Sequence, residues 1–159
     1  MQLINKLILL AGLAAPFAFN IAKANPICLT SAAGPSAIYD PLGASNIFGV
    51  GHVQITCTYV GLGSAIPAYQ IQLSTGISNS FVNRSMRLLG NNLLYNLYTN
   101  PSYSLVWGDG TGGTSVVSDS YTMSAGVIIK NYPVYMRIPG SQLVNAGMYY
   151  DNITVNVLY

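Results

Sequence analysis

Apolar and polar residues alternate along much of the chain, in short runs separated by turn-forming residues. The clearest run is 50–59, where Val53, Ile55, Cys57 and Tyr59 alternate with polar residues such as His52. Alternation with a period of two places successive side chains on opposite faces of a β-strand. We therefore expect a strand here, with these four side chains pointing inward and His52 exposed.

The same alternation recurs between turn signals and predicts further strands. These are 69–73, 84–89, 93–98, 103–107, 115–123, 126–138 and 149–159. Gly90-Asn91-Asn92 favours a hairpin turn, and the glycine-rich run 108–113 favours a loop. Turn signals about every ten residues in a chain rich in Tyr, Val and Thr are typical of a β-sandwich. The expected fold class is therefore all-β.

The last predicted strand ends with the chain. Ile153, Val155, Val157 and Tyr159 share one of its faces, and no strand follows that could pair with it. Sheet edges are normally blunted by charge, proline or closure, and the only charge on this one is Asp151. We expect an incomplete sheet that a strand from another chain completes.

Residues 1–24 have the pattern of a secretory signal peptide. Lys6 lies in a short polar start, residues 7–19 are almost wholly apolar, and Ala22-Lys23-Ala24 matches a cleavage site. The apolar run is shorter than the roughly 20 residues that span a membrane. We expect cleavage after Ala24, which leaves one exported domain over residues 25–159 with no permanent membrane insertion.

Charge is sparse in the expected mature domain. The formal net charge of +2 comes from two lysines of the signal peptide, because four basic residues balance four aspartates in the remainder. No basic patch is available to neutralise phosphates, so nucleic acid is not an expected partner. A nearly uncharged surface also lacks the repulsion that opposes association.

Two cysteines, Cys28 and Cys57, remain in the exported domain. In an oxidising compartment they are expected to form one disulfide, which removes about 3–4 kcal/mol of unfolded-state entropy in the chain-entropy description. Two thiols without a neighbouring histidine cannot complete a zinc site. The bridge is expected to tie the start of the first strand to the end of the second.

The residues needed for catalysis are scarce. His52 is the single histidine, no serine lies in a Gly-x-Ser-x-Gly elbow, and the aspartates form no evident pair. Asp109, between two glycines, is expected to form a turn rather than a metal or phosphate loop. The sequence therefore predicts a protein that is not an enzyme and needs no cofactor.

The tyrosines allow two interpretations. Tyr95, Tyr98 and Tyr103 are candidate aromatic contacts for a surface or glycan ligand. The alternative is ordinary filling of a β-sandwich core, for which aromatic residues are well suited.

Seven short motifs follow Cys28 in a fixed order. They are Tyr39-Asp40-Pro41, Val53-Gln54-Ile55-Thr56-Cys57, Arg84-Ser85-Met86, Leu94-Tyr95-Asn96-Leu97-Tyr98, Trp107-Gly108-Asp109-Gly110, Arg137-Ile138-Pro139 and Gly147-Met148-Tyr149-Tyr150-Asp151. In this order they resemble the spore coat U domain family, which includes subunits of the archaic chaperone–usher pili. The resemblance covers residues 28–159.

This resemblance implies a fold and a mode of assembly. Family members are incomplete immunoglobulin-like β-sandwiches that lack the final strand. A periplasmic chaperone lends a strand during export, and an outer-membrane usher exchanges it for the extension of another pilus subunit, which is strand addition. The expected role is a structural subunit of a cell-surface fimbria in adhesion or biofilm formation. Ile153, Val155, Val157 and Tyr159 would then border the acceptor groove.

The expected cleavage site leaves little chain to donate. Only Asn25-Pro26-Ile27 precede Cys28, and three residues span about 10 Å. Such a subunit accepts a strand but gives none, which predicts a position at the fibre tip. An earlier cleavage would leave a donor in which Phe17, Phe19 and Ile21 alternate. Two alternatives to a pilus remain: a secreted spore-coat-like structural protein and a stand-alone carbohydrate-binding module.

Overall fold

The computed structural model describes residues 24–159. The expected signal peptide therefore lies outside the described residues, apart from Ala24. No helix among residues 24–159 is long and apolar enough to cross a membrane. The helical element found there is one 3-10 turn, η1, at Gly76–Ser78.

The described residues form nine β-strands, as an all-β chain should. They are β1 (Ile27–Ala33), β2 (Ile47–Ala65), β3 (Ala68–Leu73), β4 (Ser85–Leu88), β5 (Asn91–Leu94), β6 (Asn96–Tyr98), β7 (Val117–Ser120), β8 (Met123–Ile138) and β9 (Val155–Leu158).

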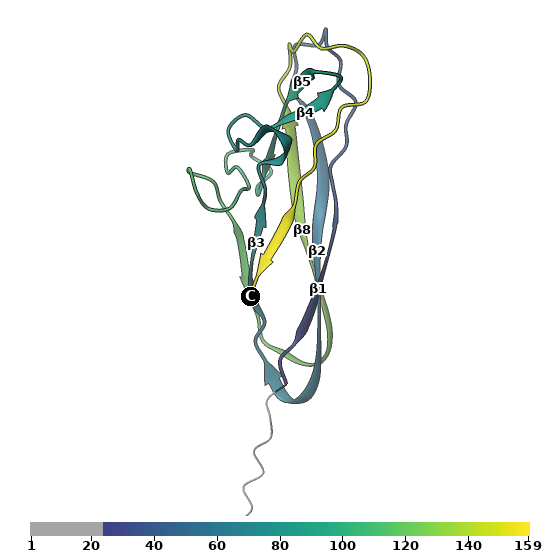
Figure 1. The fold of residues 1–159 in the computed structure, drawn as a ribbon. Helices are drawn as coiled ribbons and strands as arrows, with labels where there is room; N and C mark the ends of the chain where they lie inside the picture. Colours follow the sequence, from purple (N-terminus) through teal and green to yellow (C-terminus); the bar gives the residue numbers. More distant parts are fainter. Residues whose placement is uncertain (1–23) are drawn as a thin grey trace, which may run out of the picture.

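The strands are arranged as an antiparallel sandwich. One sheet has the order β1-β2-β8-β6 and the other the order β7-β3-β9, while β4 and β5 form a separate hairpin. Figure 1 shows β2 and β8 running along the length of the molecule, with the yellow C-terminal segment descending beside β3. The expected immunoglobulin-like sandwich is therefore the observed fold.

The core lies between the two sheets. Val53, Ile55, Cys57 and Tyr59 of β2 are all at most 1% exposed, which confirms the inward face that their alternation predicts. Trp107 is also fully buried, and its indole Nε1–H donates a hydrogen bond to the carbonyl of Ile71 in the opposite sheet (3.0 Å). His52 is exposed, as expected.

Several local predictions differ from the structure, and of the predicted strand 149–159 only Val155–Leu158 forms one. Residues 103–107 form no strand and contribute only isolated bridges, Tyr98 to Val106 and Trp107 to Ser115. The second strand runs from Ile47 to Ala65 instead of over 50–59, because its pairing with β8 resumes after an irregularity between Tyr59 and Ser64. A bulge hides the continuation, since it interrupts the period of two on which the prediction depends.

The predicted hairpin between β4 and β5 is confirmed, but its turn lies one residue earlier than expected. Leu88 pairs with Asn91, which leaves Leu89 and Gly90 as the two turn residues, with φ of 44° and 87°. A two-residue turn with positive φ at both positions matches the right-handed twist of the strands. Leucine is an unusual occupant of such a position, so the sequence favoured the neighbouring asparagines.

Candidate functional site

The sandwich is open along one side. β1 is the last strand of its sheet and β9 the last of the other, and each pairs with a neighbour on one edge only within residues 24–159. An unpaired edge presents a row of backbone N–H and C=O groups that need partners. These two free edges lie on the same side of the molecule.

A groove of about 500 Å³ lies between the two edges. The end of β1 and the turn after it form one wall, and residues 149–155 form the other. The floor is apolar, with Val53, Leu97, Val134 and Met136 of the core. A second hollow of about 770 Å³ continues the groove toward residues 144–149, because Met86, Met136 and Tyr149 line both.

Two of the four C-terminal residues expected to border this groove line it. Ile153 and Val155 line the groove directly, and Val157 packs against the core. Tyr159 lies beyond them, where its hydroxyl donates a hydrogen bond to the carbonyl of Cys28 in β1 (3.4 Å). The Tyr159 side chain therefore connects the end of β9 to the start of β1.

The expected disulfide joins Cys28 to Cys57. It attaches the start of β1 to the interior of β2, instead of to the end of that strand as the sequence suggested, because β2 is longer than predicted. Cys57 is fully buried. The bridge therefore fastens the free-edge strand β1 to the core beside the groove.

Arg84 is a buried residue that holds backbone groups near the groove wall, and this role was not predicted from the sequence. Its side chain is 0% exposed. Its guanidinium donates to the carbonyls of Ser74 (2.7 Å) and Trp107 (2.8 Å) and to Asn96 Oδ1 (2.9 Å). Burial lowers the pKa of this guanidinium. Its position in the short Arg-Ser-Met motif was the only signal in the sequence.

The Ser74 carbonyl that Arg84 holds belongs to a residue that also anchors the groove wall. The backbone N–H of Ser74 donates to the Thr154 carbonyl (3.0 Å), and its hydroxyl accepts from the Thr154 N–H (2.9 Å). The buried cation is therefore linked through one serine to the wall that precedes β9.

Two of the three tyrosines considered as contacts for a surface or glycan ligand are buried. Tyr95 and Tyr98 are each 5% exposed, so neither ring offers an open stacking face. Tyr103 is partly exposed and packs edge-on against Tyr98 (5.6 Å between ring centres) and beside Phe48 (4.6 Å). Alternation alone could not distinguish buried from exposed aromatics, because both kinds suit a strand.

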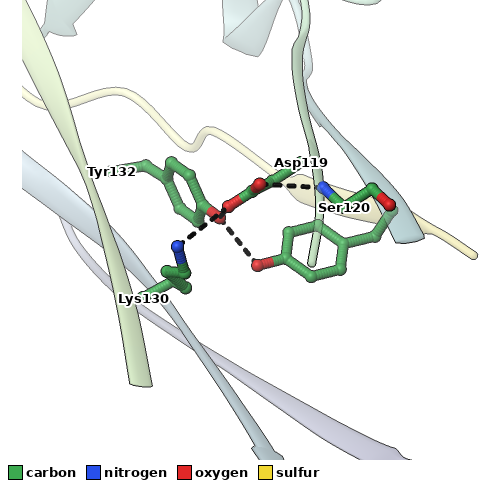
Figure 2. Close-up of polar contacts among 5 residues, drawn as sticks. Asp119, Ser120, Lys130 and Tyr132 are labelled. Atoms are coloured by element: carbon green, nitrogen blue, oxygen red, sulfur yellow. Dashed lines mark hydrogen bonds and ion pairs between the residues drawn. The ribbon is translucent and has the colours of Figure 1, made fainter. Parts of the chain in front are cut away.

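The opposite side of the sandwich is closed by a polar cluster (Figure 2). The Tyr132 hydroxyl in β8 donates to Asp119 Oδ2 in β7 (2.5 Å), and Lys130 Nζ lies 3.7 Å from the same oxygen. Tyr69 in β3 shares a hydrogen bond with the Tyr132 hydroxyl (2.7 Å). The hydrogen bond from Tyr132 holds the pKa of Asp119 below its usual value, and burial raises the pKa of Tyr69 to about 12.

The described residues show little that suits catalysis. They contain no group of three or more His, Cys, Asp or Glu side chains close enough to hold a metal ion. The Asp109 side chain accepts hydrogen bonds from the N–H and hydroxyl of Thr111 (2.9 and 2.7 Å), which is a local turn. What the groove can do chemically is bind an extended segment, through free backbone groups at its walls and apolar contacts at its floor.

Comparison with solved structures supports the fold. A chain of the crystal structure of the CsuC–CsuE chaperone–tip adhesion subunit pre-assembly complex, from the archaic chaperone–usher Csu pili of Acinetobacter baumannii, superposes with a TM-score of 0.51 at 21% identity. The match covers 84% of the present chain and 40% of that chain, so the present chain spans less than half of its length. Among curated proteins, none matches significantly.

Comparison with protein families gives a match over most of the sequence. The family model of the Spore Coat Protein U domain matches residues 15–156. This range contains all seven motifs and both walls of the groove. The chain therefore belongs to the Spore Coat Protein U domain family.

Proposed function

We propose that this chain is an exported structural subunit of a surface pilus, assembled by donor-strand complementation. The observation that carries the proposal is the groove between the free edges of β1 and β9, with its apolar floor. A strand laid in this groove would find backbone partners on either side and an apolar surface below. The similarity in fold to a chain of a chaperone–subunit complex supports the same interpretation.

In this proposal three partners take part in assembly, and two of them place a strand in the groove. A periplasmic chaperone lends a strand during export, an outer-membrane usher oversees its replacement, and another pilus subunit supplies the permanent strand. Four apolar side chains inserted at about 1.5–3 kcal/mol each would contribute roughly 6–12 kcal/mol gross. That is comparable with the whole stability of a typical domain. The isolated subunit is then marginal and the assembled fibre very stable.

The proposed position is the distal tip, and the proposed role is adhesion or biofilm formation. The support for the tip is the expected cleavage after Ala24, which leaves only three residues ahead of Cys28. N-terminal sequencing of the exported protein tests this directly. A mature protein that begins at Asn25 agrees with the tip position, whereas one that begins near Pro16 retains a donor segment and contradicts it.

The test of the groove supplies it with a strand at high local concentration. Residues 15–23, in which Phe17, Phe19 and Ile21 alternate, are appended after Tyr159 of the mature chain through a flexible Gly/Ser linker. A short flexible linker gives millimolar effective concentration, so weak binding is still detected. The matched control carries the same nine residues in an order that places the two phenylalanines and the isoleucine side by side.

We expect the alternating extension to raise the thermal unfolding midpoint by about 10 °C or more over the control, since a strand that binds only the folded state stabilises it. Equal midpoints for the two extensions would mean that the groove takes no strand of this alternating pattern, and would count against the pilus proposal.

A further inference from the structure

The groove wall before β9 has few backbone anchors of its own. β9 pairs with β3 only from Val155 onward. Upstream, Tyr150 forms an isolated bridge with Arg87, and Thr154 is held by Ser74. Between these two points, Asp151, Asn152 and Ile153 belong to no strand ladder, although all three line the groove. Something other than sheet pairing must keep this stretch in place.

The Asp151 carboxylate supplies the missing contacts. Its Oδ1 accepts hydrogen bonds from the backbone N–H groups of Ile77 (2.7 Å) and Asn152 (2.7 Å). Its Oδ2 accepts from the hydroxyl of Tyr95 (2.7 Å). One side chain thus joins the wall to the η1 turn on one side and to the core on the other. From the sequence, Asp151 was noted only as the single charge on an otherwise unprotected edge.

The residues around this carboxylate leave room for it and hold a hydrogen-bond donor beside it. Gly76 has a φ of +71° and packs so closely that a Cβ there would lie 2.2 Å from Asp151 Oδ2. A residue with a side chain would be excluded by both the backbone conformation and the carboxylate. Tyr95 is 5% exposed, and burial, followed by its hydrogen bond with Asp151, raises the pKa of its hydroxyl. The phenol therefore stays protonated and able to donate.

We propose that Asp151 is a positioning residue for strand capture: its carboxylate, held by Tyr95 and the Ile77 N–H, fixes residues 150–154 as a preformed wall opposite β1. This inference rests on the proposed function, because it assigns a role in the same groove. A wall that is already ordered saves the entropy of ordering it when a strand arrives, and pre-organised sites bind more tightly for that reason.

The test compares Asp151→Ala with Asp151→Asn and Asp109→Ala. The alanine variant removes all three contacts, whereas asparagine retains an oxygen for the two backbone N–H groups and an amide that can face the Tyr95 hydroxyl. Asp109→Ala is the matched control, because it also removes a carboxylate that accepts a backbone N–H, but in the 108–113 loop away from the groove. Each variant is measured by amide hydrogen exchange and by its affinity for a synthetic peptide with the sequence of residues 15–23.

In Asp151→Ala we expect exchange to accelerate at residues 150–154 and Ile77, with unchanged protection in β2 and β8, and peptide affinity to fall at least about tenfold. Asp151→Asn should restore most of both, and Asp109→Ala should change neither. Uniform acceleration across the domain, or full peptide affinity in Asp151→Ala, would overturn the inference and leave the proposed function standing. Failure of the wild-type protein to bind the peptide at all would count against the groove itself, and so against both.

Discussion

The two sheets of the sandwich are connected differently on its two sides. On the closed side, residues 106–107 bridge to Tyr98 and Ser115 and lead into β7, which is followed almost at once by β8. Tyr132 and Asp119 then join these two strands by a hydrogen bond (Figure 2). On the open side, β1 and β9 come from opposite ends of the domain, and the Tyr159 hydroxyl makes the direct hydrogen bond between them.

The difference teaches that closure here follows chain connectivity. Where consecutive segments cross from one sheet to the other, main-chain and side-chain bonds close the gap. Where the chain provides no crossing segment, an edge stays free on each sheet, and the wall beside it depends on buried polar anchors such as Arg84.

The largest effect is expected from the anchor behind the open side. Arg84→Met provides an apolar side chain of similar length but leaves the Ser74 and Trp107 carbonyls without their donor, while Asn96 Oδ1 keeps only the Leu97 N–H. Unpaired buried polar groups are costly, so we expect the free energy of unfolding to fall by about 3–5 kcal/mol in urea titrations. Arg87→Met is the control, because Arg87 is exposed and should lose less than about 0.5 kcal/mol. Similar losses for both would contradict the role assigned to Arg84.

A smaller effect is expected on the closed side. Tyr132→Phe removes the hydroxyl that joins Asp119 to Tyr69, and should cost about 1–3 kcal/mol of unfolding free energy. Tyr135→Phe is the matched control: it lies on the outer face of the same strand, and its hydroxyl makes no hydrogen bond within residues 24–159. If the linked donor strand stabilises Tyr132→Phe as much as the wild type, the two sides act independently. A loss of that response would show that the closed side also shapes the groove.

The smallest effect is a difference in alkaline sensitivity. Burial raises the pKa of Tyr69 from 10.0 to about 12, so the folded protein holds this proton more tightly than the unfolded chain. The stability that this group contributes is complete below pH 10 and is lost as the pH rises toward 12. We expect the unfolding free energy of the wild type to fall more steeply over that interval than that of Tyr69→Phe, measured by chemical denaturation at each pH. Parallel curves would mean that Tyr69 titrates alike in both states.

Features of the fold that depend on neighbouring residues could be predicted from the sequence, whereas features that depend on distant residues could not. The inward face of β2 follows from alternation, and the disulfide follows from cysteine count and compartment, so Ile55, Cys28 and Cys57 were predictable. Alternation also indicated a strand at β9, although the predicted range 149–159 is longer than the observed Val155–Leu158. Burial of Arg84 was not predictable, since its hydrogen-bond partners are carbonyls 10 and 23 residues away in sequence.

The same limit applies to the candidate site. The pattern of residues 149–159 indicated a strand without a partner, but not which edge would face it, because that depends on the sheet order. Tyr95 was weighed as a surface aromatic and is instead the buried donor to Asp151. Its role depends on the close approach of two segments 56 residues apart, which no local period encodes.

The disulfide also decides how the domain bears tension. A pull applied at the N-terminal end enters at Cys28 and passes through the sulfur atoms directly to Cys57, so residues 29–56 form a loop that carries no load. Beyond Cys57 the force reaches only the last part of the antiparallel pairing of β2 and β8, because the pairs from Ile47 to Thr56 lie inside the loop. The wall of the groove on β1 lies inside the unloaded loop, and it can therefore keep its shape while the rest of the chain is stretched.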